Sequence, residues 1–166
     1  YRNGFRPPKE IMQRVILVTV GGLKEEWAKL AASQYERRIR PSVSFDVVEL
    51  PASKERDDRK QKKDESRRLL EHAQKYRGAL LVLDESGKQR TSVQFSHDLE
   101  DMKDAGTNLI VILGGAYGLD DSVLEAADRI LSLSDMTLPH ELCRIVFMEQ
   151  LYRACEITKG SGYHHI

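Results

Sequence analysis

The stretch LIVILGGAYG, residues 109–118, decides the fold of this chain. Its first five residues are apolar, which is typical of a β-strand buried on both faces of a parallel sheet. Gly114 and Gly115 follow directly, and Gly118 is close behind. Glycines at the carboxyl end of a buried strand allow a sharp turn and let a ligand approach the main chain. The stretch therefore predicts either a ligand-binding loop at the edge of an open α/β sheet or a plain tight turn.

Apolar runs and helical patterns alternate along the rest of the chain. Four further strands are expected, at residues 15–20, 45–50, 79–83 and 130–133. Helices are expected at residues 24–39, 92–106, 123–129 and 140–158, with a charged helix or loop at residues 53–77. Ser53 can cap that charged helix, and Gly87 is expected to mark a turn. The alternation predicts an α/β fold with a mostly parallel sheet flanked by helices.

Length and charge limit the kinds of protein that this chain can be. It has 166 residues, of which 40% are hydrophobic, and its formal net charge is zero. The length suits one domain, which is expected over residues 12–166, with residues 1–11 as a flexible N-terminal extension. No apolar run approaches the length of a membrane span. Any nucleic acid must be bound by a local basic patch, because the chain as a whole is neutral.

The two cysteines, Cys143 and Cys155, are expected to be reduced residues of the core. They lie twelve positions apart in one expected helix, which separates them by several turns and excludes a disulfide. No metal-ligand spacing surrounds them, so no metal site is expected. Free thiols indicate a reducing compartment, and a cytoplasmic location is therefore expected. An organelle is the alternative if residues 1–11 are the remnant of a leader.

Residues 54–68 form the most charged segment of the chain. They contain eight Lys or Arg and five Asp or Glu, a local excess of three positive charges. One interpretation is a solvated helix or loop with ion pairs along its surface. The other is an arm that binds RNA phosphates. The contacts of that arm would be Lys60, Lys62, Lys63, Arg67 and Arg68.

Residues 132–140, SLSDMTLPH, place three apolar side chains in an expected loop. Such side chains need the core or a flat apolar ligand to pack against. The helix that follows carries apolar residues on nearly every side, so it is expected to be buried on more than one side. A second subunit can supply that burial. The helix therefore predicts a homodimer with Met148 or Leu151 at the interface.

Four motifs in this order resemble the ribosomal large-subunit pseudouridine N3-methyltransferase family, one of the knotted SPOUT methyltransferases. They are ILGGAYGL (residues 112–119), LSLSDMTLPH (residues 131–140), RIVFMEQLYRACEI (residues 144–157) and the ending GYHH (residues 162–165). LVLDESG, residues 81–87, is similar to the first cofactor segment of that family. The family often has a basic residue after Tyr-His, where this chain has His165.

The resemblance implies a C-terminal deep trefoil knot and S-adenosylmethionine bound in the knot in a bent shape. It further implies that main-chain groups of three loops hold the adenosine. The corresponding positions are Leu83, Gly114, Gly115, Leu133, Ser134, Asp135, Met136, Thr137 and Leu138. These residue types suit the role, because paired glycines admit a close approach and apolar side chains can flank an adenine.

The resemblance also implies methyl transfer to N3 of a pseudouridine in large-subunit ribosomal RNA. The N3–H must lose its proton, and histidine is the natural base near neutral pH. The candidate catalytic residues are His164 or His165 as the base and Tyr163 as a stacking platform. We expect the site to be shared between subunits, with this tail ordering when RNA arrives. Asp135 and Glu141 are the next candidate bases, and His140 is expected only to orient the final helix.

Two other classes of function stay open. A nucleotide-binding oxidoreductase would use the glycine turn, but GGAYG lacks the first glycine spacing of the dinucleotide fingerprint. A non-enzymatic RNA-binding or ribosome-assembly module would need the basic segment but not the apolar loop at residues 133–138. A cofactor-binding experiment separates these alternatives from a methyltransferase.

Overall fold

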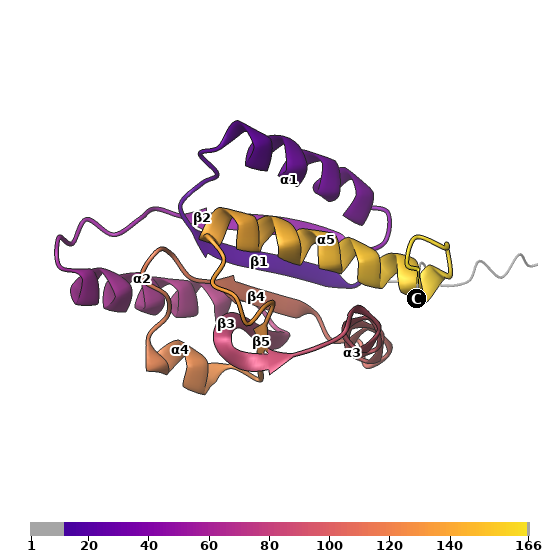
Figure 1. Ribbon diagram of the computed structural model, residues 1–166. Helices are drawn as coiled ribbons and strands as arrows, with labels where there is room; N and C mark the ends of the chain where they lie inside the picture. The colour runs from indigo at the N-terminus through magenta and orange to yellow at the C-terminus, as the bar shows by residue number, and fades with distance from the viewer. Residues whose placement is uncertain (1–11, 166) are drawn as a thin grey trace, which may run out of the picture.

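Five parallel strands form one sheet through the middle of the molecule (Figure 1). The computed structural model describes residues 12–165, so the expected extension at residues 1–11 lies outside the described part. The strands are β1 (Arg14–Val20), β2 (Ser44–Leu50), β3 (Ala79–Gln89), β4 (Leu109–Leu113) and β5 (Arg129–Ser132). Their order is β2-β1-β4-β3-β5, and every neighbouring pair is parallel. The predicted parallel α/β sheet is confirmed.

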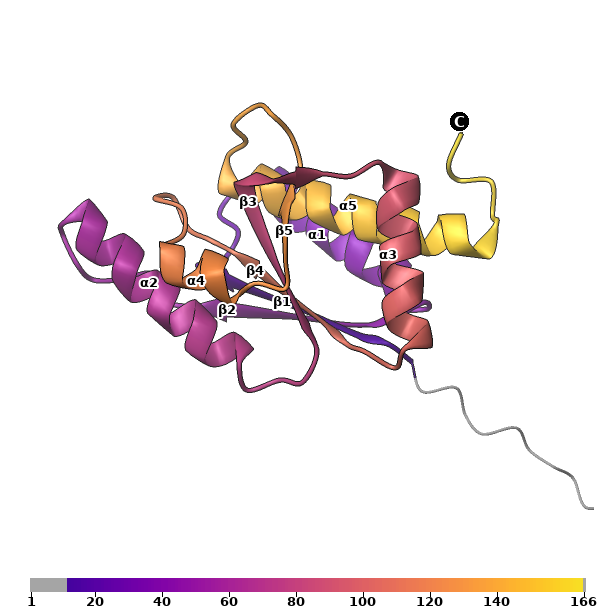
Figure 2. The ribbon, with the colours of Figure 1, turned by 90° about the horizontal axis from the view of Figure 1, so that it is seen from below.

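Helices cover both faces of this sheet. They are α1 (Glu26–Ile39), α2 (Asp58–Ala73), α3 (Ser92–Asp104), α4 (Asp121–Ala126) and α5 (His140–Lys159). α1, α3 and α5 lie over one face, and α2 and α4 lie over the other (Figure 2). Successive residues of β1 alternate between the two cores, with Ile16 in one and Leu17 in the other. All five residues of β4 are buried, because helices shield both of its faces.

The carboxyl ends of the parallel strands share one edge of the sheet. Leu83 of β3 pairs in register with Leu113 of β4 and with Leu131 of β5. The chain leaves β4 through the glycine loop, residues 114–119, and leaves β5 through the apolar loop, residues 133–138. The fold therefore brings these two loops to one edge, where open α/β sheets bind ligands.

The start of α2 differs from the prediction. The side chain of Asp57 accepts a hydrogen bond from the N–H of Lys60 at 2.9 Å, so Asp57 is the N-cap. The prediction that Ser53 caps this helix is wrong, because the segment before Asp57 runs without helical structure. The charged segment is a helix only from Asp58 onward, preceded by a loop at residues 51–57.

Gly87 does not mark a turn, as the sequence predicts. β3 continues through this position to Gln89 and pairs with β5 after a shift in register. A Cβ on Gly87 would lie 2.6 Å from the carbonyl carbon of Ile130. The glycine is therefore required by the close approach of two strands rather than by a turn.

α5 is buried mainly by its own chain. The fully or nearly buried side chains of this helix are Arg144, Ile145, Phe147, Met148, Leu151, Ala154 and Cys155. Met148 and Leu151 have no exposed surface, so the prediction that one of them lies at a subunit interface is wrong. Leu142, Val146 and Ile157 stay partly exposed. Within residues 12–165 no helix is long and apolar enough to cross a membrane.

Candidate functional site

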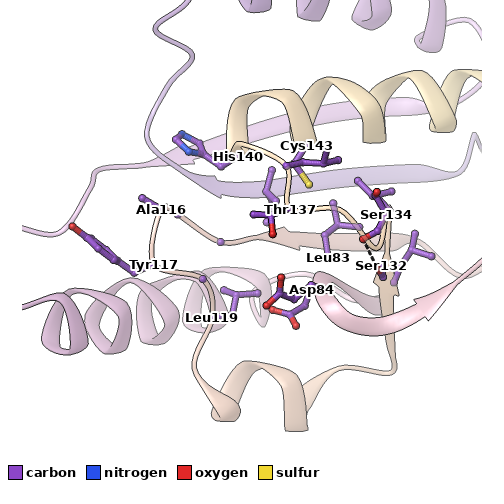
Figure 3. Close-up of a pocket in the computed structure, with 18 of the residues that line it drawn as sticks. Leu83, Asp84, Ala116, Tyr117, Leu119, Ser132, Ser134, Thr137, His140 and Cys143 are labelled. Atoms are coloured by element: carbon purple, nitrogen blue, oxygen red, sulfur yellow. Dashed lines mark hydrogen bonds between the residues drawn. The ribbon is translucent and has the colours of Figure 1, made fainter.

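A cavity of about 380 Å³ lies at the carboxyl ends of β3, β4 and β5. Residues 83–85, the glycine loop and the apolar loop form its walls, and His140 and Cys143 of α5 close it (Figure 3). These segments are far apart in the sequence. The volume is within the range of small-molecule sites.

The structure brings together all but one of the residues that we predicted for the cofactor. Those that line the cavity are Leu83, Gly114, Gly115, Leu133, Ser134, Met136, Thr137 and Leu138. Asp135 is exposed and is not among the lining residues. Ser134 holds the apolar loop in shape, because its hydroxyl accepts from the N–H of Met136 at 2.9 Å and its carbonyl accepts from the hydroxyl of Ser132 at 3.0 Å. Cofactor binding by these residues stays a prediction.

The two glycines of the loop have different neighbours. A Cβ on Gly114 would lie 2.8 Å from Cγ of Leu119, which also lines the cavity. A Cβ on Gly115 would lie 2.7 Å from Oε2 of Glu65, a side chain of α2 that does not line the cavity. Gly115 therefore makes room for a carboxylate behind the loop, whereas the sequence suggested only room for a ligand.

Five further lining residues can carry chemistry, and they were absent from our predicted cofactor set. They are Asp84, Glu85, Tyr117, His140 and Cys143. Asp84 and Glu85 directly follow the apolar part of β3, and that position is the signal that could have found them. Among the lining residues in the described part of the chain there is no Lys or Arg. The cavity therefore favours a cationic ligand over a phosphate.

The tail, residues 160–165, folds back against α5. Gly160 and Gly162 have φ values of +66° and +79°, which allow the chain to reverse after the helix. The hydroxyl of Tyr163 donates to Oε1 of Glu149 at 3.2 Å. The ring of Tyr163 also meets that of Tyr152 edge-on, with centroids 4.8 Å apart. These contacts join the tail to the end of α5. Ordering of the tail by RNA stays a prediction.

The two tail histidines lie in different surroundings. Nδ1 of His164 is 3.2 Å from Nη1 of Arg153, so the ring accepts from a guanidinium that can only donate. His165 is exposed. Arg153 lies about 20 Å along α5 from His140, given the rise of 1.5 Å per helical residue. The tail lies at the opposite end of α5 from the start of the helix (Figure 1). Within one chain the candidate catalytic residues of the tail thus lie far from the cavity, which is lined by His140 at the start of α5.

The other candidate bases also lie in distinct surroundings. One oxygen of Glu141 accepts from the N–H of Lys24 at 2.5 Å and from that of Glu25 at 3.3 Å. The hydrogen bond from Lys24 is the main cause that lowers the pKa of Glu141, which makes this carboxylate a weak base. His140 lines the cavity, although the sequence suggested only a structural role. His140 is therefore the best-placed base that the chain itself brings to the cavity.

In the charged segment, residues 54–68, some basic side chains form ion pairs within the described part of the chain and others do not. Arg67 and Arg68 both pair with Asp64, at 2.9 and 3.1 Å. Arg68 also donates to the carbonyl of Pro51 at 2.6 Å. Three of the predicted RNA contacts form no ion pair with any described residue: Lys60, Lys62 and Lys63. Both interpretations of the segment thus find support in different residues, and RNA binding stays a prediction.

The basic segment begins beside the cavity. Tyr117, a lining residue, extends toward α2 (Figure 3). Hydrogen bonding to Asp58 in the first turn of α2 is the main cause that raises the pKa of the Tyr117 hydroxyl. A polyanion on the basic segment and a ligand in the cavity would therefore be neighbours.

Several known proteins are similar to this chain. Residues 12–164 match the family described as "Predicted SPOUT methyltransferase". The protein named Ribosomal RNA large subunit methyltransferase H from Ruminiclostridium cellulolyticum is 37% identical over 158 residues, which are 91% of this chain and 99% of that protein. The protein of the same name from Geotalea daltonii is 37% identical over 153 residues, covering 92% and 99%. A solved structure, the SpoU methyltransferase AviRb from Streptomyces viridochromogenes in complex with the cofactor AdoMet, matches 90% of this chain and 59% of its own, with a TM-score of 0.46 and 12% identity.

Proposed function

Because the chain belongs to the SPOUT methyltransferase family, we propose that it methylates N3 of a pseudouridine in large-subunit ribosomal RNA. Family membership makes the chain an enzyme that uses S-adenosylmethionine. The name of its relatives supports large-subunit ribosomal RNA as the substrate class. The motifs that end in GYHH support the pseudouridine and its N3 as the target. The deep trefoil knot implied by the same motifs stays a prediction.

The observation that carries the proposal is the make-up of the cavity walls. Glycine backbone, apolar side chains and the carboxylates of Asp84 and Glu85 surround a space that suits a small molecule. S-Adenosylmethionine has a positive sulfonium, which acidic walls favour. A dinucleotide has a pyrophosphate, which basic side chains would favour, and the described cavity walls contain no Lys or Arg. The walls therefore favour a methyltransferase over a nucleotide-binding oxidoreductase.

Each of the three segments that form the cavity would hold a different part of the cofactor. Main-chain groups of Leu83, Gly115 and the apolar loop would hold the adenosine, and Leu133 and Leu138 would flank the adenine. When bound, the cofactor supplies a methyl group on a positively charged sulfur. Half-buried Cys143 and the first turn of α5 would exclude water from one side.

The proton on N3 needs an acceptor, and we propose that two subunits share the site. His164 contacts Arg153 about 20 Å along α5 from the cavity, so a partner's tail would have to bring it there. The same holds for His165 and for Tyr163, which would stack on the nucleobase. His140 is the alternative acceptor, because it lines the cavity of its own chain.

A homodimer through α1 and α5 would provide such a partner. These two helices lie side by side on one face of the sheet (Figure 2). Trp27 and Leu30 of α1 are 49% and 65% exposed, which is unusual for large apolar side chains on one helix. Val146 of α5 is also partly exposed. A second copy would cover these apolar side chains.

Calorimetry on the purified protein tests the cofactor, and mass mapping of ribosomal RNA tests the reaction. In calorimetry we expect the protein to bind S-adenosylmethionine without added metal. In ribosomes incubated with the protein and S-adenosylmethionine, we expect one extra methyl group on a pseudouridine. No cofactor binding would contradict the proposal as a whole. A methyl group on another nucleotide would contradict only the target. RNA binding without cofactor binding and without methylation would favour the ribosome-assembly alternative.

The location of the protein follows from its substrate. Ribosomes occupy the cytoplasm of bacteria such as those that supply its relatives, so we propose a cytoplasmic enzyme. Ribosomes of an organelle are the alternative. Fractionation of the source cells, followed by detection with an antibody, distinguishes the two.

A further inference from the structure

Glu65 of α2 is a buried carboxylate without a counter-charge. Only 2% of its surface is exposed. Oε1 accepts from the N–H of Ser53 at 2.9 Å and from the side-chain amide of Gln61 at 3.1 Å. Among residues 12–165, no basic side chain forms an ion pair with Glu65, and no hydrogen bond reaches Oε2. Burying an unpaired charge is costly, so a positive charge is expected nearby.

The free oxygen of Glu65 lies directly behind the glycine loop. A Cβ on Gly115 would lie 2.7 Å from Oε2, so the backbone of Gly115 separates the carboxylate from the cavity. The adjacent Ser66 hydroxyl accepts from the N–H of Asp120 at 2.9 Å and fixes the far end of the loop to α2. The N–H of Ser53 and the side-chain amide of Gln61 hold the carboxylate in this position. The carboxylate of Glu65 therefore stands behind the cavity wall.

We propose that Glu65 is a positioning residue whose charge makes the cavity prefer S-adenosylmethionine to S-adenosylhomocysteine. The inference rests on the proposed function. The two molecules differ in one methyl group and in the positive charge on sulfur, which is lost when the methyl group leaves. A negative charge behind this wall stabilises the cation and leaves the neutral thioether unaffected. Glu65 thus favours loading of the cofactor and release of the product.

Calorimetry with the two ligands on the Glu65→Gln variant tests this. Glutamine keeps the size and an oxygen acceptor but removes the charge. We expect the affinity for S-adenosylmethionine to fall about tenfold and that for S-adenosylhomocysteine to change less than about twofold. Equal losses for both ligands would show a purely structural role and overturn the inference, as would no loss for either. Glu71→Gln, an exposed position on the same helix, is the matched control and should change neither affinity.

A second variant keeps the test decisive if Glu65→Gln does not fold. Glu65→Asp retains the charge, so the ratio of the two affinities should stay that of the wild type even where both affinities fall. A ratio that shifts in Glu65→Asp would overturn the inference. Wild-type protein that binds neither ligand would contradict the proposed function. Wild-type protein that binds both, with an unchanged ratio in Glu65→Gln, would contradict only the role of Glu65.

Discussion

Cys143 packs against the core and also lines the candidate cofactor cavity. It is half-buried on α5 and lines the cavity, whereas Cys155 of the same helix is buried in the core. Burial raises the pKa of the Cys143 thiol, so the group is neutral at physiological pH and a poor nucleophile. Its contribution to the cavity is therefore its small size.

Enlarging Cys143 should close the cavity to the cofactor. We expect Cys143→Phe to weaken S-adenosylmethionine binding at least about tenfold, because the ring fills space that the ligand needs. Calorimetry measures the affinity, and near-isosteric Cys143→Ser should stay within about twofold of the wild type. Unchanged binding by Cys143→Phe would mean that the cofactor binds elsewhere.

Gly115 tests the packing of the glycine loop on α2. A Cβ would lie 2.7 Å from the buried Oε2 of Glu65, so Gly115→Ala must displace a carboxylate that has little room to move. We expect the free energy of unfolding in urea to fall by about 1–3 kcal/mol. The double variant Gly115→Ala, Glu65→Ala lacks the clash. Its loss in free energy of unfolding should therefore be smaller than the sum of the losses in the two single variants. Simple additivity would contradict this contact.

The tail is the element whose removal should separate binding from catalysis. Its contacts are with Glu149, Tyr152 and Arg153 on α5, remote from the cavity of the same chain. Deleting residues 163–166 should therefore abolish methylation of ribosomes and leave cofactor affinity nearly intact. Methylation at the wild-type rate by the truncated protein would exclude a catalytic role for the tail.

Single histidine variants should identify the proton acceptor. Loss of the base is expected to reduce the methylation rate about a hundredfold or more, whereas loss of a bystander has little effect. Single-turnover rates of His164→Ala, His165→Ala and His140→Ala on ribosomes measure this. A large loss of methylation rate only in His140→Ala would place the base in the cofactor-binding subunit. It would exclude His164 and His165 as the base.

The basic half of α2 should bind RNA through its unpaired lysines. Replacing Lys62 and Lys63 by Ala should weaken RNA binding and reduce the slope of log affinity against log salt by about one to two. Titration of labelled RNA at several salt concentrations measures both. Arg67→Ala is the matched control, because Arg67 already pairs with Asp64 and Glu71. An equal change in salt slope for Arg67→Ala would contradict the special role of the lysines.

At the scale of the whole molecule, the expected homodimer can be tested without disturbing the core. Leu30 is 65% exposed, so Leu30→Glu should leave the chain folded and split a dimer that covers this surface. Sedimentation at micromolar concentration measures the mass. Gln74→Glu, which adds the same charge at an exposed position beyond α2 on the opposite face, should stay dimeric. A monomer mass for the wild type would refute the dimer.

The types of the elements and the location of the candidate cofactor site were predictable from the sequence. The apolar run of β4 specifies a strand buried on both faces, because each alternate residue must face a core. The loops after β4 and β5 meet at one edge, because parallel strands end together. Of the predicted cofactor residues only Asp135 misses the cavity, since it lies at the exposed tip of its loop.

Only the tertiary structure decided which neighbour each side chain meets. The apolar pattern of α5 shows that its sides are buried, but packing of the chain itself covers Met148 and Leu151. Glu65 is one of five acids in a charged segment, and its burial against Gly115, fifty residues away, depends on how α2 docks on the sheet. A local pattern records the period of a helix or strand. It does not record contacts between distant segments, which arise only when the chain closes its loops and packs its layers.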